Sequence, residues 1–381
     1  MSVEIREVKT SKDLNAFVRL PYSMYKKNPY YVPTLISDTK DTLNPRKNPA
    51  FEFCDAKSWI AFRDGKIAGR ITGIINHKFI EKWKDKYARF GWIEFEDDLE
   101  ISGALLGAVE SWAKKNGLDA VQGPLGFTDF DEEGMLIRGF DEMSSLPMIY
   151  NFPYYPEHME KLGYGKDVDW MQFEIPIPKL LPDKVMRVHD LVLKRTKLRV
   201  IKLRSRKEVF KYTDGVFDVL NQAYAPLYGV TPLSDKQIQI YIKQYLGLLN
   251  IDFLKVIVNE KEEVVGFAIV APSLSFAMRK AWGRLFPFGF IHILWALSHP
   301  EYIDLWLVAI RPDYHGRGLN SLLFVELVKA CEKYGTRIAT TTGQLEHNDQ
   351  VNAFWRGFDT RQHIQRRSFI KHFAEKPSRA T

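Results

Sequence analysis

Cysteine and long apolar runs are both scarce in this sequence. Cys54 and Cys331 are the two cysteines in 381 residues, which excludes the disulfide framework of a small secreted domain. No uninterrupted apolar stretch reaches the roughly 20 residues of a membrane-spanning helix. Residues 1–8 mix charged and apolar side chains in a strand-like order, which is not the pattern of a secretory signal peptide. We therefore expect a cytoplasmic protein.

Blocks of like charge are missing as well. The chain has 54 Lys and Arg against 47 Asp and Glu, a formal net charge of +7, which suits anionic ligands such as phosphates or acidic lipid. The cations are scattered and show no basic-aromatic pattern of an RNA-binding module, so we do not expect a nucleic acid partner. Histidines number nine and the acids lack calcium-loop spacing, so no metal site is expected.

The same order of elements is predicted twice along the chain. A length of 381 residues favours two domains. In the first half, the periodicities predict strand, helix, hairpin, strand, helix, strand, helix and strand at 4–8, 12–27, 59–75, 89–95, 101–116, 118–122, 158–164 and 170–175. In the second half, they predict a strand at 198–203, helices at 207–224 and 235–249, a hairpin at 253–270, a strand at 302–311, a helix at 321–334 and strands at 337–342 and 365–371.

A proline-rich stretch at 176–182 separates the two halves. Proline cannot donate to a sheet ladder, so we interpret this stretch as a linker. The expected organisation is one domain at 1–176, a linker and helix at 177–197, and a second domain at 198–381. The expected fold class is α/β, with a mixed α+β sheet: two tandem domains, each a central, mostly antiparallel sheet flanked by helices.

A short loop in the second half suggests a phosphate site. An apolar run at 305–310 leads into Arg311-Pro-Asp-Tyr-His-Gly-Arg-Gly-Leu-Asn320, and an apolar-periodic helix follows. The first turn of a helix presents unpaired backbone amides and the positive end of the macrodipole. Gly316 and Gly318 let the backbone approach a ligand closely, and Arg317 adds a cation. Together these features suit a pyrophosphate.

This loop and the residues after it resemble the GNAT superfamily of acyl-CoA-dependent N-acyltransferases, over about residues 198–373. The family loop reads Gln/Arg-x-x-Gly-x-Gly/Ala, and here it reads His315-Gly-Arg-Gly-Leu-Asn320. The family's next helix reads roughly Asn-x-x-Ala-x-x-x-Tyr before Gly-Phe. Here Asn348, Val351, Phe354 and Trp355 fill those places, ahead of Gly357 and Phe358. Trp355 stands where many members carry a proton-donating Tyr, and an indole cannot donate a proton at neutral pH.

The resemblance implies a donor and a set of site residues. The donor would be acetyl-CoA or another acyl-CoA, with its pantetheine pairing along the main chain near Val308 and Ile310. Attack by the amine would be direct, so it needs a base for the amine and an acid for the thiolate. The cofactor-binding candidates are Val308, Ile310, His315, Gly316, Arg317, Gly318, Leu319, Asn320, Asn348 and Trp355. The acid–base candidates are Asp304, Glu346 and Tyr314, and the acceptor-binding candidates are Tyr224 and Tyr228.

The first half differs at the corresponding helix start. Residues 96–100 read Glu-Asp-Asp-Leu-Glu, with no glycine pair and no cation. Acids stabilise the start of a helix, but they repel a pyrophosphate. We therefore expect the first half not to bind CoA in this way.

Two further segments have no place in a minimal GNAT domain. Residues 123–155 resemble a set of uncharacterised bacterial GNAT-like proteins and are dense in acids and aromatics. They either bind an amine or form a solvated connection. The acids are Asp129, Asp131, Glu132, Glu133 and Asp141, and the aromatic walls would be Tyr150, Tyr154 and Tyr155. Residues 274–300 are apolar and basic, without acids. They cover the other domain, line an acyl-chain pocket or lie on an acidic membrane face.

The sequence thus predicts an acyl-CoA-dependent N-acyltransferase, in which an amine of a small molecule or a peptide attacks the thioester. Two alternatives stay open at this level. One is a GNAT-fold transferase that uses aminoacyl-tRNA or a fatty acyl carrier as donor. The other is a non-catalytic GNAT-fold binding protein. A homodimer also stays open, because no sequence feature bears on the oligomeric state.

Overall fold

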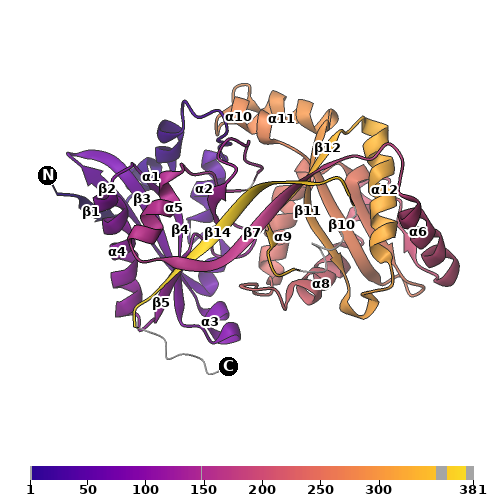
Figure 1. The fold of residues 1–381 in the computed structure, drawn as a ribbon, viewed down its shortest axis with the longest axis horizontal. Coiled ribbons are helices and arrows are strands. Elements are labelled where there is room, and N and C mark those ends of the chain that lie inside the picture. The colour runs from indigo at the N-terminus through magenta and orange to yellow at the C-terminus, as the bar shows by residue number, and fades with distance from the viewer. Residues whose placement is uncertain (1, 147, 349–357, 375–381) are drawn as a thin grey trace.

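One continuous mixed sheet runs through the whole molecule. The structure, a computed structural model, describes residues 2–146, 148–348 and 358–374. Its 14-stranded sheet has the order β1-β2-β3-β4-β5-β14-β7-β12-β11-β10-β9-β8, with β6 on β14 and β13 on β7. Helices cover the sheet at both ends, so the chain forms two lobes (Figure 1). The expected mixed α/β class with tandem sheet-and-helix units is confirmed.

The first lobe is built from the N-terminal half. Its strands are β1 (Glu4–Glu7), β2 (Cys54–Arg63), β3 (Lys66–Asn76), β4 (Tyr87–Phe95), β5 (Ala120–Gly123), β6 (Met135–Arg138) and β7 (Gly165–Pro176). Its helices are α1 (Ser11–Met24), α2 (Ile36–Thr42), α3 (His77–Trp83), α4 (Leu99–Lys115) and α5 (Tyr154–Lys161), with a short 3₁₀ turn at Pro49–Glu52.

The second lobe repeats the plan. Its strands are β8 (Arg199–Val200), β9 (Leu254–Val258), β10 (Val264–Pro272), β11 (Tyr302–Ile310), β12 (Ile338–Thr341), β13 (Gln344–Leu345) and β14 (Arg361–His372). Its helices are α6 (Asp183–Arg195), α7 (Arg206–Val209), α8 (Thr213–Tyr224), α9 (Asp235–Tyr245), α10 (Ser275–Ala281), α11 (Gly289–Ser298) and α12 (Leu319–Tyr334). Short 3₁₀ turns lie at Leu246–Leu248, Ile251–Phe253 and Pro312–Tyr314.

The closing strands of the two halves are exchanged. In each lobe two strands run parallel, β4 with β5 and β11 with β12. The strand beside β5 is β14, from the end of the chain, and the strand beside β12 is β7, from the first half. The strands β7 and β14 also pair with each other and cross diagonally between the lobes (Figure 1). The strand predicted at 170–175, the last one of the first half, therefore lies between two strands of the second half.

Successive side chains of a strand point to opposite faces of the sheet and pack against the helices on each face. In β2, Trp59 and Ala61 lie in the core under α4, while Ile60 packs with Phe17 of α1. In β9, Val256 packs beneath α8 and Ile257 beneath α12. This period of two is the expected geometry of a strand buried on both faces.

Local predictions succeed where turn chemistry is strong. Asp64 and Gly65 join β2 to β3, and both have positive φ, 53° and 75°, as a tight hairpin turn requires. Two predicted elements are shorter than expected. The helix predicted at 207–224 is interrupted between α7 and α8, where the Thr213 hydroxyl donates to the Phe210 carbonyl. The strand predicted at 198–203 pairs only over Arg199–Val200. Among the described residues, no helix has the length and apolarity needed to cross a bilayer.

Candidate active site

The predicted phosphate loop follows β11 and opens α12. Gly316 and Gly318 have φ values of 71° and 81°, a region that side chains with a Cβ rarely adopt. A Cβ added at Gly318 would lie 2.7 Å from Val188 Cγ1 of α6, whereas one added at Gly316 would meet open space. The helix therefore begins at a residue that only glycine suits, with its first turn toward the loop.

Two cations flank the ring of Tyr314, and only one is engaged in ion pairs. The Arg311 guanidinium donates to both carboxylate oxygens of Asp313, at 2.8 and 3.0 Å, and pairs with Glu263. Arg317 lies 4.9 Å over the ring of Tyr314, is exposed, and has no ion pair with any described carboxylate. The Tyr314 hydroxyl accepts from Asn259 Nδ2 at 3.5 Å. Arg317 is therefore the cation available to a phosphate.

The strands β11 and β12 separate beyond Leu305. Their parallel pairing covers only Tyr302 to Leu305, while the opposite edge of β11 stays paired with β10 as far as Ile310. Two main-chain oxygens proposed for the pantetheine contact are occupied by side chains. The Tyr224 hydroxyl donates to the Val308 carbonyl at 3.3 Å, and His315 Nε2 donates to the Ile310 carbonyl at 2.8 Å. A ligand strand added here would compete with these two side chains.

A single large cavity connects this loop with the first lobe. Its volume is about 2310 Å³, more than twice the upper end of roughly 1000 Å³ for ordinary small-molecule pockets. At one end it is lined by Tyr314, His315, Gly316, Gly318, Leu319 and Asn320. At the other end it is lined by Asp129, Asp131, Glu132 and Glu133. Most of the lining between these ends is apolar. Arg317 lies just outside the lining.

The acids of the first lobe project into this cavity. Asp129 accepts from the Thr231 amide at 3.3 Å, and Asp131 accepts from the Thr128 amide at 3.0 Å, so both are anchored to backbone. Burial raises the pKa of Asp131 to about 6 and the pKa of Glu132 to about 7. Burial, reinforced by the charge of Asp129, raises the pKa of Glu133 well above its ordinary value. Carboxylates with raised pKa values are suited to accept a proton near neutral pH.

The aromatic walls beside these acids differ from those predicted. Tyr150 and Tyr155 are buried in the first lobe, where Tyr155 donates to Glu94 at 2.8 Å, and neither they nor Tyr154 line the cavity. The rings of these tyrosines pack in or against the hydrophobic core of that lobe. The tyrosines that do line the cavity come from the second lobe: Tyr212, Tyr224, Tyr228, Tyr241, Tyr245 and Tyr314. Tyr241 and Tyr245 were not predicted, and their spacing on one face of α9 was the available signal.

Tyr224 and Tyr228 lie on the cavity wall between its two ends. The Tyr228 hydroxyl donates to Asp167, at 2.9 and 3.0 Å from its two oxygens. Burial raises the pKa of Tyr228 and raises that of Tyr224 to about 12. Both hydroxyls therefore stay protonated at neutral pH and serve as hydrogen-bond donors.

Asp304 and Glu346, the two predicted bases, do not line the cavity. Asp304 is buried within the sheet, opposite Ala271 and Thr340. Burial raises its pKa to about 7, and its predicted role as a base stays a prediction. Glu346 accepts from Lys166 at 2.6 Å and from the Asp169 amide at 3.2 Å, so it ties β13 to β7.

The predicted residues after β12 are only partly described. Asn348 lines the cavity, and its backbone amide donates to the Leu345 carbonyl at 3.0 Å. Trp355, with Val351 and Phe354, lies outside the described residues. Its predicted place near the thioester therefore stays a prediction.

The corresponding helix start in the first lobe is filled by its own residues. Asp98 is the N-cap of α4 and accepts from the Glu100 amide at 2.9 Å. The Arg63 guanidinium bridges Asp98 and Glu100, and Asp97 pairs with His158. The acids that the sequence places here thus satisfy the helix start themselves.

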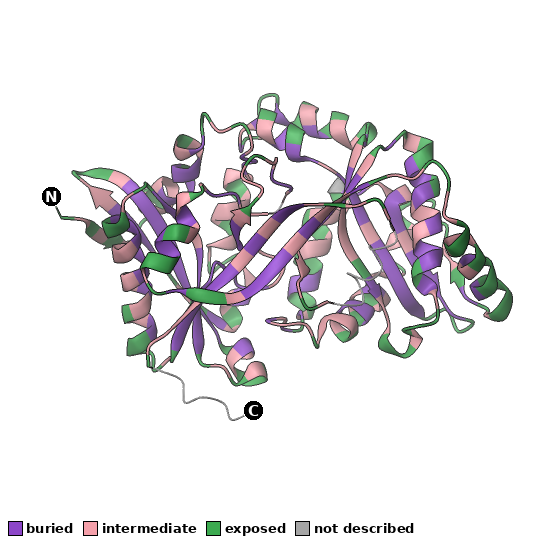
Figure 2. Cartoon of the chain, viewed as in Figure 1, coloured by how far each residue is buried: buried purple, intermediate pink, exposed green. Residues whose placement is uncertain are grey.

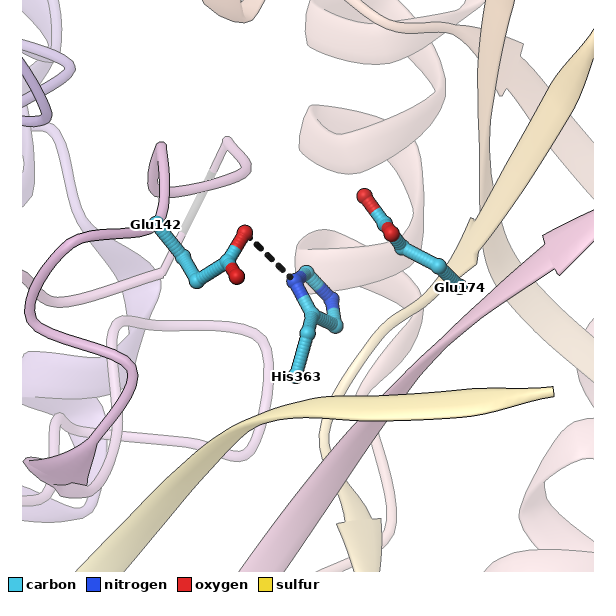
Figure 3. A group of neighbouring side chains, drawn as sticks. All are labelled: Glu142, Glu174 and His363. Atoms are coloured by element: carbon cyan, nitrogen blue, oxygen red, sulfur yellow. Dashed lines mark ion pairs between the residues drawn. The ribbon is translucent and has the colours of Figure 1, made fainter.

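Glu142, Glu174 and His363 form a trio outside the cavity (Figure 3). Their candidate ligand atoms lie within 4.8 Å of one another. However, Arg361 donates to Glu142 at 2.5 Å and to Glu174 at 2.6 Å. These hydrogen bonds lower the pKa of Glu142. The guanidinium already supplies the positive charge between the two carboxylates, so we assign this trio to an ion-pair network that joins β7, β14 and the 139–146 loop.

The part of the chain that contains the glycine loop matches a known protein family. The Acetyltransferase (GNAT) family model matches residues 235–358, which span α9 and the β11–loop–α12 unit described above. Residues 235–358 therefore match the GNAT family. The match covers the half with the glycine loop and does not extend to the first half, where the GNAT-like helix start is acidic.

Two relatives align with most of this chain. Protein YghO of Escherichia coli is 28% identical over 337 residues, 86% of this chain and 83% of that protein. The bacterial ceramide synthase of Caulobacter vibrioides is 27% identical over 301 residues, 76% of this chain and 75% of that protein.

Among solved structures, a tandem GNAT protein from the clavulanic acid biosynthesis pathway has a TM-score of 0.55 at 12% identity, over 99% of this chain and all (100%) of that one. A GCN5-related N-acetyltransferase from Sphaerobacter thermophilus has a TM-score of 0.54 at 10% identity, over 98% and 96%. These two likenesses show the fold. The family match over residues 235–358 indicates an acyltransferase.

Proposed function

We propose that this GNAT protein is an acyl-CoA-dependent N-acyltransferase whose acceptor is a long-chain amine. One observation supports this above the others: a single cavity reaches from the glycine loop of the second lobe to the buried carboxylates of the first. A donor held by its phosphates at the loop and an amine held at the carboxylates would meet inside one water-poor space.

The two ends of the cavity divide the chemistry between them. Gly316, Gly318 and the first turn of α12 would hold the pyrophosphate, with Arg317 at the rim. The thioester would lie along the open edge of β11, near Val308, where main-chain amides stabilise the developing oxyanion. Glu132 would accept a proton from the incoming ammonium, because its pKa of about 7 suits a base near neutral pH. Glu133 lines the cavity beside it.

The transfer step follows direct attack. The neutral amine nitrogen forms a bond with the thioester carbonyl carbon, and the C–S bond breaks as the tetrahedral intermediate collapses. The ammonium first gives one proton to a carboxylate. As the C–S bond breaks, the thiolate leaves with the electron pair and takes the second proton lost by the nitrogen, directly or through water. The products are an amide and CoA. No covalent enzyme intermediate is needed, in keeping with the buried, unreactive thiols of Cys54 and Cys331, whose pKa values burial raises to about 12.

The proposed length of the substrates rests on the cavity and on one relative. About 2310 Å³ of mostly apolar space exceeds what an acetyl group and a small amine would fill. The relative from Caulobacter vibrioides is a ceramide synthase, and a ceramide is an amide of a fatty acid with a long-chain amino alcohol. We therefore propose a fatty acyl donor and an amine with an alkyl chain.

The test is amide formation measured by mass spectrometry. Purified protein would be incubated with acetyl-CoA or palmitoyl-CoA, and with sphinganine or ethanolamine as the amine. We expect an N-acyl product from the pair with two long chains, at a kcat/KM at least roughly tenfold above the short pairs. A palmitoyl-loaded acyl carrier protein would be assayed in parallel. Product from the carrier but from neither CoA ester would refute the donor, and no amide from any pair would refute the function.

A further inference from the structure

Helix α11 is apolar on both of its faces. Its inner face buries Ile293 and half-buries Ala296 and Leu297 against Val32, Leu274 and Met278. Its outer face places Phe290, Ile291, Leu294 and Trp295 in solvent. A helix that is apolar all round is normally covered on every side. The outer face of α11 is therefore an uncovered surface that the chain itself does not fill.

The exposed apolar side chains gather on this segment and are not spread over the molecule. Among the described residues, fourteen large apolar side chains are exposed, and seven of them fall within residues 276–295. Phe286 is 76% exposed, Phe288 68% and Trp295 63%. Figure 2 shows the outer side of α10 and α11 with several exposed residues at the edge of the second lobe. We call this surface the α10–α11 face. It is made of Phe276, Phe286, Phe288, Phe290, Ile291, Leu294 and Trp295.

The charge of the segment has one sign. No Asp or Glu occurs from residue 264 to residue 300, whereas Arg279, Lys280 and Arg284 lie beside the apolar side chains. None of the three forms an ion pair with a described carboxylate. A concentration of unpaired cations around exposed aromatics matches an anionic lipid surface, where apolar groups enter the headgroup layer and cations meet phosphates.

The face is continuous with the cavity. Leu285, Phe290, Ile293, Leu294 and Leu297 line the cavity, and Phe290 and Leu294 also belong to the exposed face. The same helix thus separates solvent from the apolar interior that we assign to alkyl chains. A second copy of this chain would need an acidic patch to complement these cations, whereas a membrane of acidic phospholipids supplies that charge along its whole surface.

We propose that the α10–α11 face docks on the surface of an anionic bilayer, with the aromatic side chains in the headgroup layer and the three cations on lipid phosphates. The orientation places the α11 wall of the cavity at the lipid surface. Docking does not depend on the transferase activity. The inference that alkyl substrates enter past α11 rests on the proposed function, and the two fail in different assays.

The test is cosedimentation of the full chain with phosphatidylcholine vesicles that contain phosphatidylglycerol, and with vesicles of phosphatidylcholine alone. The apolar variant replaces Phe286, Phe288 and Trp295 by Ser. These residues do not line the cavity. The charge variant replaces Arg279, Lys280 and Arg284 by Gln. The matched control replaces Leu180 and Phe210 by Ser, because both are exposed, at 88% and 54%, and lie elsewhere. No acyl-CoA or amine is present.

We expect the wild type and the control to bind the anionic vesicles. The apolar variant should bind at least roughly tenfold less, and the charge variant should lose both the preference for anionic lipid and the salt dependence. Circular dichroism would establish that each variant is folded. If the apolar variant does not fold, the charge variant decides. Equal binding by all four proteins, or none by the wild type, would overturn the proposal. So would a dimer by light scattering that the apolar variant converts to a monomer, since a second copy would then cover the face.

Discussion

The starts of α4 and α12 occupy the same place in the repeated plan but are built for opposite charges. Both helices follow the strand of a parallel pair. At α4 the N-cap is Asp98, and Arg63 neutralises it together with Glu100. At α12 the N-cap is Gly318 with φ of 81°, and no described acid lies in the first turn. One helix start completes its own hydrogen bonds and charges, and the other leaves them for a ligand.

The comparison shows how a repeated unit can change its role. The first lobe has an acidic, self-satisfied helix start, but it supplies the buried carboxylates at the far end of the shared cavity. The second lobe supplies the glycine loop and the tyrosine wall. We infer that the first lobe is the acceptor-binding partner of the second, and the predictions below test that division, from the largest expected effect to the smallest.

Separating the halves should have the largest effect. Residues 1–176 alone would leave β5 without its neighbour β14. They would also leave β7 without its partners β12, β13 and β14. We expect this fragment to be unfolded or aggregated, by circular dichroism and size-exclusion chromatography. Coexpression with residues 177–381 should restore one folded complex. A monomeric, cooperatively unfolding 1–176 fragment would show that the exchanged strands are not required.

Replacing the cavity carboxylates Glu132 and Glu133 should abolish activity without weakening the binding of acyl-CoA. In a Glu132→Gln, Glu133→Gln variant we expect kcat to fall by about 100-fold or more, the usual size of a general-base contribution. Calorimetric affinity for acyl-CoA should not change. Asp141→Asn is the matched control, since Asp141 belongs to the same acidic segment but does not line the cavity. Unchanged kcat in the double variant would remove these residues from the mechanism.

Substitutions at the start of α12 should weaken the binding of acyl-CoA, whereas a substitution at the start of α4 should not. Arg317→Glu changes an exposed side chain without disturbing packing, and we expect acyl-CoA affinity to fall at least roughly tenfold. The affinity of the Gly318→Glu variant for acyl-CoA should fall further, because the added Cβ would also lie 2.7 Å from Val188 Cγ1. At α4, Asp98→Ala should cost about 1 kcal/mol of stability and leave the affinity unchanged. Loss of affinity in the Asp98 variant would contradict a single CoA site.

The acidic end of the cavity should make activity and stability depend on pH in opposite directions. Burial raises the pKa of Glu132 from 4.5 to about 7, so its base form accumulates, and kcat/KM should rise, as pH increases toward about 7. The folded state binds this proton more tightly than the unfolded state, so its stabilising contribution is lost as pH rises through the same range. Glu132→Gln should flatten both profiles in rate assays and thermal unfolding. Profiles identical to wild type would assign the titration elsewhere.

Tyr224→Phe should have the smallest effect. The substitution removes the hydroxyl that donates to the Val308 carbonyl, which frees that oxygen for a ligand strand. We expect a loss of stability of about 1 kcal/mol, with acyl-CoA affinity equal to or up to a few-fold above wild type. Calorimetry would measure the affinity for acyl-CoA and thermal unfolding would measure the stability, so the two effects can be separated. A large loss of affinity would mean that Tyr224 itself contacts the donor.

Local structure followed from local chemistry. The turn at Asp64 and Gly65, the glycine loop before α12 and the acidic start of α4 are each decided by dihedral preference or capping within a few residues. The GNAT resemblance of the second half rested on the same short segments. The roles predicted for Asp304 and Glu346 as bases stay predictions. The strand and loop positions of Asp304 and Glu346 indicated nothing about which side of the sheet they face or which side chains neutralise them.

By itself, the sequence determined the repeated order of elements, the position of the phosphate loop and the charge difference between the two helix starts, because these depend on neighbouring residues. Only the tertiary structure decided that β7 and β14 exchange lobes, because the choice of neighbouring strand joins segments far apart in the chain and no local pattern specifies it. It also decided that Glu132 and Glu133 lie in one cavity with the glycine loop. Their pKa values are raised by burial. The cavity that they line is also lined by residues more than a hundred positions away, such as Tyr241 and Tyr245, which no local pattern contains.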